Sequence, residues 1–226
     1  SENGRIAART GYIALYGEQY DEALKALDRW QKLEPDAKDL PRMYAVIHLR
    51  LGQPKEAVPY IEKLLSSTSS NSVDEAMAVK QLLAKEATTE HAYVVLQRLN
   101  YKENKNKHLL VLQSRYAAQL QRYDESLALL DQVLEIDPSL HEVMIIKSRI
   151  LTAQGKHDEA SLLIEQLLEE LPENNTLRLK YARMLVEQNK LEAAIEQYSI
   201  LYEKMPDDED IVLSYALLNI ETKNLD

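Results

Sequence analysis

The sequence predicts an all-α protein, a solenoid built from repeated pairs of helices. Pro138, Pro172 and Pro206 are spaced 34 residues apart, and a helical stretch, a break and a second helical stretch precede each of them. A fixed period of this length is typical of stacked supersecondary units. The chain also has only five Gly and seven Pro, where average usage gives about sixteen and eleven. So few turn residues do not suit a many-stranded sandwich or barrel.

Composition excludes several classes of function. The chain has 45% hydrophobic and 28% charged residues, which is ordinary for a globular protein and argues against disorder. The absence of Cys excludes thiol nucleophiles, thiolate metal sites and disulfides. A net charge of −10 argues against nucleic acid as the main partner. No apolar run reaches the roughly 18 residues that a direct membrane span needs.

The period divides the chain into six helix pairs and a half repeat, with boundaries at 4–37, 38–71, 72–106, 107–140, 141–174, 175–208 and 209–226. The repeat 72–106 is degenerate because it is one residue too long. We expect the extra residue near Thr88–Thr89, since the second helix then aligns on Ala92, Leu96 and Leu99.

Small residues recur at the eighth position of the repeats, where the two helices of a pair must cross closely. These eighth positions are Gly11, Ala45, Val79, Ser114, Ser148, Ala182 and Ala216. The half repeat has a first helix without a partner, so one apolar face stays uncovered: Leu213, Leu217 and Ile220, or alternatively Val212, Tyr215 and Leu218. Because repeats bury their core against neighbours, we expect the chain to be a fragment of a longer array.

This period and helix–turn–helix pattern resemble the tetratricopeptide repeat, whose consensus has small residues at positions eight and twenty and Pro at position thirty-two. The resemblance implies a right-handed α-solenoid whose first helices line a concave groove for a partner protein. Carried over to this chain, it gives the groove residues Tyr12, Tyr16, Arg42, Val46, Lys80, Arg115, Arg149, Arg183 and Leu217.

Three of these groove residues, Arg115, Arg149 and Arg183, are 34 apart. We predict that they form a row on successive first helices, which Lys80 extends. The alternative is that each Arg pairs with a neighbouring acid and has a structural role. The Lys and Asn residues with which chaperone-binding members of the family hold a peptide carboxylate are missing, which argues against a chaperone-tail receptor.

No motif indicates catalysis, a cofactor or a metal. His141–Glu142 is not followed by the second His that a helical zinc site requires. The run Ser66–Ser72 is predicted to be a turn, and no His or Asp is placed to activate its hydroxyl groups. We therefore predict that the chain is not an enzyme.

Residues 5–16 and 177–186 are similar, more loosely, to long repeat lipoproteins of Gram-negative bacteria. Some of those are periplasmic adaptors, anchored in the outer membrane, that bind a carboxyl-terminal processing protease and present substrates to it. This second resemblance implies a periplasmic, outer-membrane-associated location, with the cytoplasm as the alternative.

The function that the sequence predicts is a non-catalytic scaffold or adaptor whose groove holds an extended peptide or helix of another protein. A processing protease or its substrates would be one such partner. The first alternative is self-assembly, in which the array ends build a homo-oligomer. The second is an array that serves a catalytic domain outside these 226 residues.

Overall fold

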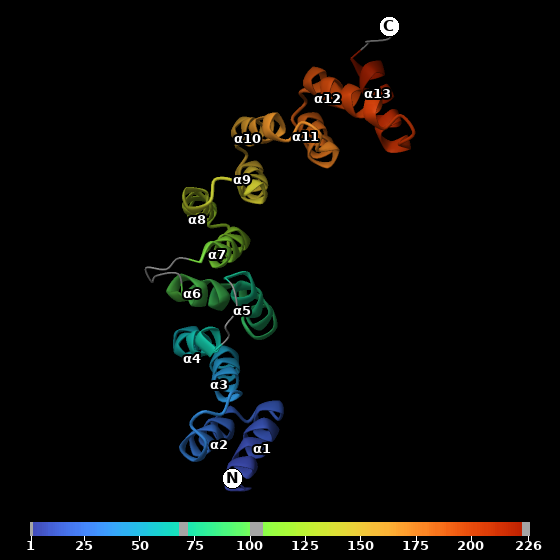
Figure 1. Cartoon of the computed structure of the whole chain (residues 1–226). Coiled ribbons are helices and arrows are strands. Elements are labelled where there is room, and N and C mark those ends of the chain that lie inside the picture. The colour runs from blue at the N-terminus through green and yellow to red at the C-terminus, as the bar shows by residue number, and fades with distance from the viewer. Residues whose placement is uncertain (1, 68–71, 100–105, 223–226) are drawn as a thin grey trace. The chain divides into compact units, whose positions relative to one another are not determined.

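A computed structural model describes residues 2–67, 72–99 and 106–222. The described residues form thirteen α-helices and no strand (Figure 1), which confirms the predicted all-α class. The helices are α1 (Glu2–Tyr16), α2 (Tyr20–Leu33), α3 (Leu40–Arg50), α4 (Pro54–Ser67), α5 (Ser72–Glu86), α6 (Thr89–Leu99), α7 (Lys107–Gln119), α8 (Tyr123–Ile136), α9 (His141–Ala153), α10 (His157–Glu170), α11 (Asn175–Glu187), α12 (Leu191–Lys204) and α13 (Glu209–Glu221). They divide into two compact units, Ser1–Ile136 and Asp137–Asp226.

Successive helices pair closely in five places: α1 with α2, α3 with α4, α7 with α8, α9 with α10, and α11 with α12. The contacts explain why small residues recur where these helices cross. A Cβ atom at Gly11 would lie 2.9 Å from Leu27 Cδ2. In another pair the Ser126 hydroxyl donates a hydrogen bond to the Ser114 carbonyl oxygen at 2.7 Å. A larger side chain at such a crossing would push the two helices apart.

The turn inside each of these pairs has one geometry. A residue with a left-handed backbone, φ between 56° and 77°, stands at the fifteenth position of each repeat: Glu18, Gly52, Gln121, Gly155 and Asn189. The next N–H donates to a carbonyl five residues earlier, as from Lys156 to Leu151 at 2.9 Å. This is the Schellman pattern, which ends a helix and reverses the chain. The break seen in the sequence is therefore one turn type, repeated.

Leucine and isoleucine side chains fill the interior of both units. In the unit Ser1–Ile136, one cluster surrounds Leu27 and another surrounds Leu83. In the unit Asp137–Asp226, a cluster surrounds Leu167 and Leu201. Complete burial of such a side chain contributes roughly 1.5–3 kcal/mol, so these clusters are the main source of stability.

Polar contacts link successive repeats at recurring positions. The Tyr44 hydroxyl donates to Asp28 Oδ1 at 2.6 Å, and the equivalent Tyr181 hydroxyl donates to the Glu165 carboxylate. Burial and these hydrogen bonds raise the pKa of both tyrosines above the usual value. Both phenols therefore stay neutral and act as hydrogen-bond donors between neighbouring repeats.

Helix α5 departs from the pairing pattern. It does not pack closely along α6, within the part of the chain that the structure describes; α6 instead lies between α4 and α7 (Figure 1). Helix α5 buries Ala76, Val79 and Leu83. Their counterparts in α11, three periods of 34 residues further along, are buried as well: Arg178, Tyr181 and Leu185. The packing of α5 thus matches that of α11 when the repeat begins at residue 73.

This match moves the extra residue of the degenerate repeat. Ala92 and Ala194, also three periods apart, are both fully buried at the starts of α6 and α12. Both α5 and α6 thus lie three whole periods before their counterparts, so no residue is inserted between them near Thr88–Thr89. The extra residue precedes α5. The Thr88 side chain instead caps α6 by accepting a hydrogen bond from the His91 N–H at 3.2 Å. Thr68–Asn71 of the predicted serine-rich turn lie outside the described residues.

The revised register explains why α5 and α6 separate. The eighth position becomes Lys80, which is exposed, in place of Val79. A lysine side chain is too long and too polar for a close helix crossing. The turn at Ala87 and Thr88 also lacks the left-handed residue of the other turns. Both features remove the contacts that hold the other pairs together.

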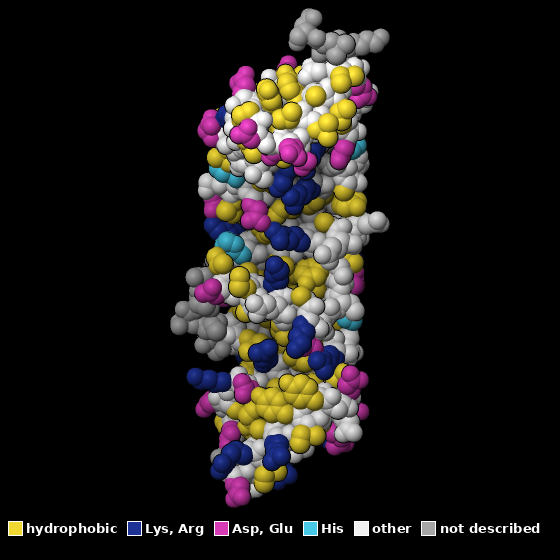
Figure 2. Space-filling view, turned by 90° about the vertical axis from the view of Figure 1, so that its right-hand side faces the viewer, with side chains coloured by type: hydrophobic (Ala, Val, Ile, Leu, Met, Phe, Trp, Pro, Cys, Tyr) yellow, Lys and Arg dark blue, Asp and Glu magenta, His cyan; other side chains and the backbone are white. Residues whose placement is uncertain are grey.

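Helix α13 leaves an apolar face uncovered. Leu213, Leu217 and Ile220 are 60%, 56% and 60% exposed, whereas Leu218 is buried. The first of the two faces that the sequence offered is therefore the exposed one. Figure 2 shows hydrophobic side chains gathered over α13, with acidic side chains at their border. The first turn of α13 contains Glu209 and Asp210, where acids offset the helix dipole.

The closeness of the helix crossings predicts the effect of enlarging an eighth-position residue. Ala182→Leu, at a fully buried site, should reduce the free energy of unfolding by about 1–3 kcal/mol because the pair α11–α12 becomes overpacked. Ala216→Leu is the matched control, since Ala216 holds the same position on α13 and is exposed. It should change stability by less than about 0.5 kcal/mol. Urea denaturation measures both, and equal effects would contradict the crossing argument.

The open arrangement of α5 and α6 predicts their dynamics. Within residues 66–106, the amides of α5 and α6 should exchange hydrogen faster than the amides of residues 141–206. The free energy of local opening should be lower for α5 and α6, because the stability of a repeat depends on its contacts with neighbouring helices. Hydrogen exchange followed by mass spectrometry resolves the two regions. Equal protection of α5 and α11 would show that the lost pairing has no energetic consequence.

Candidate partner-binding groove

A pocket of about 340 Å³ lies between α9 and α11. These two first helices supply almost all of its wall, and α10 adds one residue. The lining residues are Ile145, Ser148, Arg149, Thr152, Ile164, Leu177, Lys180, Tyr181, Arg183, Met184 and Glu187. The pocket thus occupies the face where the repeat resemblance places a partner.

Three cations line this pocket: Arg149, Lys180 and Arg183. All three are exposed. Within the described residues, none of them has a carboxylate at ion-pair distance, although ion pairs form elsewhere in the same unit, such as Lys204–Glu173 at 2.8 Å. Glu187 also lines the wall, so the charged side chains around the pocket sum to a positive value in a chain of net charge −10.

The other polar groups of this pocket are already used inside the protein. The Ser148 hydroxyl donates to the Ile145 carbonyl oxygen at 2.9 Å, and the Thr152 hydroxyl donates to the Ser148 carbonyl oxygen at 3.0 Å. The Tyr181 hydroxyl donates to Glu165, and burial and this hydrogen bond raise its pKa above the usual value. The guanidinium and ammonium groups therefore remain as the donors facing outward. Guanidinium groups form forked hydrogen bonds with carboxylates.

The structure brings two residues of the predicted arginine row together. Arg149 and Arg183 line one pocket, whereas Arg115, also exposed, lies on α7 in the unit Ser1–Ile136. Lys80 is exposed and takes the eighth position of its repeat in the revised register. In the revised register the ninth position of its repeat is Gln81, which stands 34 residues before Arg115.

The remaining predicted groove residues differ in how much surface they offer. Tyr16 is 79% exposed, whereas Val46 is only 8% exposed and packs in the core, so Val46 presents little surface to a partner. Tyr12 is half-buried, and its hydroxyl donates to Asp39 Oδ2 at 3.1 Å. Arg42 is exposed and lines a pocket in the first unit. Leu217 belongs to the exposed face of α13.

Sequence reasoning missed Lys180. It occupies the sixth position of its repeat, which the resemblance also directs into the groove, but among its equivalents in the other repeats only Arg9 of the first repeat is cationic. In the repeats 107–140 and 141–174 they are Leu112 and Ile146. Cations at the sixth position of only two distant repeats give no periodic signal, and the pocket between α9 and α11 is what brings Lys180 beside the two arginines.

No helix in residues 2–67, 72–99 and 106–222 is long and apolar enough to cross a membrane. In the same residues, no three His, Asp or Glu side chains gather as metal ligands.

Sequence comparison identifies the repeats along most of the chain. Residues 9–72 match one family model described as tetratricopeptide repeat, and residues 117–174 and 151–218 match another with the same description. Residues 73–116, between these matches, contain α6 and all but the first residue of α5, the two divergent helices. No functionally curated protein matches the chain.

Solved structures support the fold. A tetratricopeptide repeat protein from Parabacteroides merdae superposes with a TM-score of 0.52 at 16% identity, covering 99% of this chain and 88% of that one. PilW, described as a type IV pilus biogenesis factor, gives 0.55 at 13%, covering 95% and 99%. MamA from Desulfovibrio magneticus gives 0.53 at 15%, covering 69% and 88%.

These likenesses are to the fold, and the looser resemblance to protease-binding lipoproteins gains no support from them. Tetratricopeptide repeats are in general non-catalytic scaffolds that mediate protein–protein interactions. The recurring turns, the small residues at the helix crossings and the two matching repeat models agree, and the chain belongs to the tetratricopeptide repeat family.

Proposed function

We propose that this chain is a non-catalytic interaction scaffold that holds an acidic segment of a partner protein in the pocket between α9 and α11. One observation carries the proposal: Arg149, Lys180 and Arg183 line the same pocket without an ion-pair partner among the described residues. Cations left unpaired in a concave surface are available to carboxylates from another molecule.

The competing explanation for these arginines is a structural role in ion pairs with neighbouring acids. That role needs a carboxylate within about 4 Å, and the contacts described for Arg149 and Arg183 do not include one. A pocket that is positive inside an acidic protein also selects by charge. Its field acts over roughly a Debye length, about 8–10 Å at physiological salt, so it favours acidic segments that reach into the groove.

An adaptor that presents substrates to a processing protease would be a specific form of this function. It would place the protein in the cell envelope, as the looser resemblance implies, and a signal sequence followed by Cys in the complete reading frame would support that location.

The binding proposal predicts a salt-dependent interaction that three substitutions weaken. Arg149→Gln, Lys180→Gln and Arg183→Gln together should weaken binding of a labelled Glu- and Leu-rich dodecapeptide about tenfold or more, since each exposed pair contributes up to ~1 kcal/mol. The dependence of the dissociation constant on salt should become shallower. Fluorescence anisotropy at several salt concentrations measures both, and circular dichroism should stay unchanged because Gln favours helix.

The matched control replaces three exposed lysines outside the pocket, Lys32, Lys38 and Lys156, by Gln. It changes net charge by the same amount and should bind the peptide nearly as the unsubstituted chain does. Equal binding by both triple variants and the unsubstituted chain would end the proposal. A lower melting temperature of the pocket variant with unchanged binding would favour the structural role of the cations.

The exposed face of α13 favours a second candidate function, self-assembly. Leu213, Leu217 and Ile220 form an apolar strip of the kind that marks interaction surfaces. If two copies associate through it, light scattering should show a mass that rises with concentration, and Leu217→Glu should keep the protein monomeric. A monomeric mass for the unsubstituted chain at all concentrations would exclude this candidate.

A further inference from the structure

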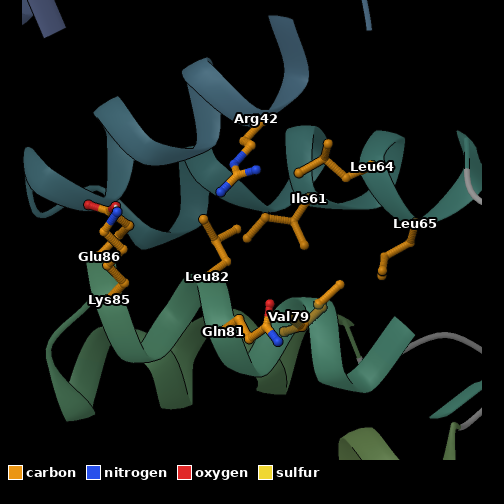
Figure 3. Close-up of a pocket in the computed structure, with 10 residues that line it drawn as sticks. Arg42, Ile61, Leu64, Leu65, Val79, Gln81, Leu82, Lys85 and Glu86 are labelled. Carbon is orange, nitrogen blue, oxygen red and sulfur yellow. The ribbon is translucent and has the colours of Figure 1, made fainter. Parts of the chain in front are cut away.

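The unit Ser1–Ile136 contains a second pocket, of about 360 Å³, between α3, α4 and α5 (Figure 3). Its lining residues are Arg42, Ile61, Leu64, Leu65, Ala78, Val79, Gln81, Leu82, Lys85 and Glu86. Its volume is near the lower end of the roughly 300–1,000 Å³ found for ligand pockets. It therefore suits one or two side chains of a peptide better than a large ligand.

This pocket stands at the same place in the repeat as the pocket between α9 and α11. On α5 the residues Val79, Gln81 and Leu82 are three periods before the α11 lining residues Tyr181, Arg183 and Met184. The two remaining walls also correspond, because Arg42 aligns with Ile145 and Ile61 aligns with Ile164 once the extra residue is counted. The repeat geometry thus forms equivalent recesses in both units.

The chemistry of the two pockets differs. Where the α11 pocket has Lys180 and Tyr181, the α5 pocket has the smaller Ala78 and Val79. Leu64, Leu65 and Leu82 add further apolar wall, as Figure 3 shows. The recess of the first unit therefore has more aliphatic side chains and fewer cations among its lining residues, and it suits a hydrophobic side chain.

Cations stand beside this apolar wall. Arg42 extends from α3 toward Leu82 (Figure 3), is exposed, and has no ion pair among the residues described. Lys85 is also exposed, and its Nζ lies 3.8 Å from Glu86 Oε1. The acid of the pocket, Glu86, is already occupied: its side chain is only 7% exposed, and Arg50 donates to it at 2.7 Å. Its negative charge is thus compensated within the protein.

We infer that this pocket binds a bulky apolar side chain of a partner protein segment in which an acidic residue stands next to the apolar one. The apolar side chain enters between Ile61, Val79 and Leu82, and the carboxylate pairs with Arg42 or Lys85. A basic residue beside the apolar one would meet like charge and be rejected. The inference rests on the proposed function only in that the partner is a protein segment; it does not require the cations between α9 and α11.

The open arrangement of α5 supplies the physical reason for the recess. Helix α4 packs along α6 rather than along α5, so side chains of α4 and α5 do not fill the space between the two helices. An apolar recess that its own neighbours leave unfilled gains free energy when a partner's side chain displaces water from it.

The test is selection of random dodecapeptides displayed on phage against the full chain. The expected result is enrichment of sequences with Leu, Ile, Met, Phe or Trp within two residues of Asp or Glu. A synthetic peptide of that kind should bind the Ala78→Trp variant at least tenfold more weakly, because the indole fills the pocket. Ala84→Trp is the matched control, since Ala84 is an exposed alanine of α5 that does not line the pocket, and it should retain binding.

A second pair of variants tests the charge. The double variant Arg42→Gln, Lys85→Gln should bind the acidic peptide about three- to tenfold more weakly than the unsubstituted chain does. Its binding of a version of the peptide with Ser in place of the acidic residues should be unchanged. Lys80→Gln, on the same helix but outside the pocket, should have no effect. Failure to enrich such sequences, or binding that Ala78→Trp leaves intact, would overturn the inference.

The proposed function is judged separately in this experiment. The triple variant Arg149→Gln, Lys180→Gln, Arg183→Gln should bind the selected peptide as the unsubstituted chain does, if the pocket of the first unit holds the peptide. Loss of binding in that variant, with Ala78→Trp unaffected, would assign the peptide to the α9–α11 pocket and refute the inference while supporting the proposed function.

Discussion

The close crossing of two helices at the eighth position of each repeat is the constraint on which the rest of the structure depends. At Gly11 a single Cβ atom would already press against Leu27, and at Ser114 and Ser126 the helices are near enough for a side chain to bond the opposite backbone. The left-handed turn residue that follows reverses the chain in the same way each time. With crossing and turn fixed, successive first helices come to lie side by side and can form a shared surface.

The divergent helix α5 shows what happens when this constraint is relaxed. Lys80 stands where a small residue is needed, the turn before α6 lacks its left-handed residue, and α6 packs against α4 and α7 instead of α5. The core nevertheless stays continuous, because Ala76, Val79 and Leu83 still pack with residues of the neighbouring helices. One irregular repeat thus changes the surface between α4 and α5 without removing the hydrophobic cluster that stabilises it.

Charge is distributed unevenly over the first helices. Many cations elsewhere are used within the protein, as Arg122 is with Glu90 and Lys190 with Asp158, in contacts between successive repeats. Arg149, Arg183 and Arg42 face pockets instead. A surface cation used internally contributes little to stability, whereas one that faces a recess can determine which partner enters. The scaffold therefore offers two recesses of the same origin and different chemistry, one with more cations and one with more aliphatic side chains among the lining residues.

By itself, the sequence determined the all-α class, the 34-residue period and the small residues at the crossings, because these are local or periodic properties that one chain displays directly. It also identified Arg149 and Arg183, since both recur at one repeat position. Tertiary structure decided what periodicity cannot encode. The extra residue was misplaced near Thr88–Thr89 because the burial of α5, which fixes the register, depends on contacts with helices far along the chain. Only the packing showed that Val46 is buried and that Lys180 lies beside the two arginines. The helix packed against a side chain decides whether that side chain contacts a neighbouring helix or stays available to a partner.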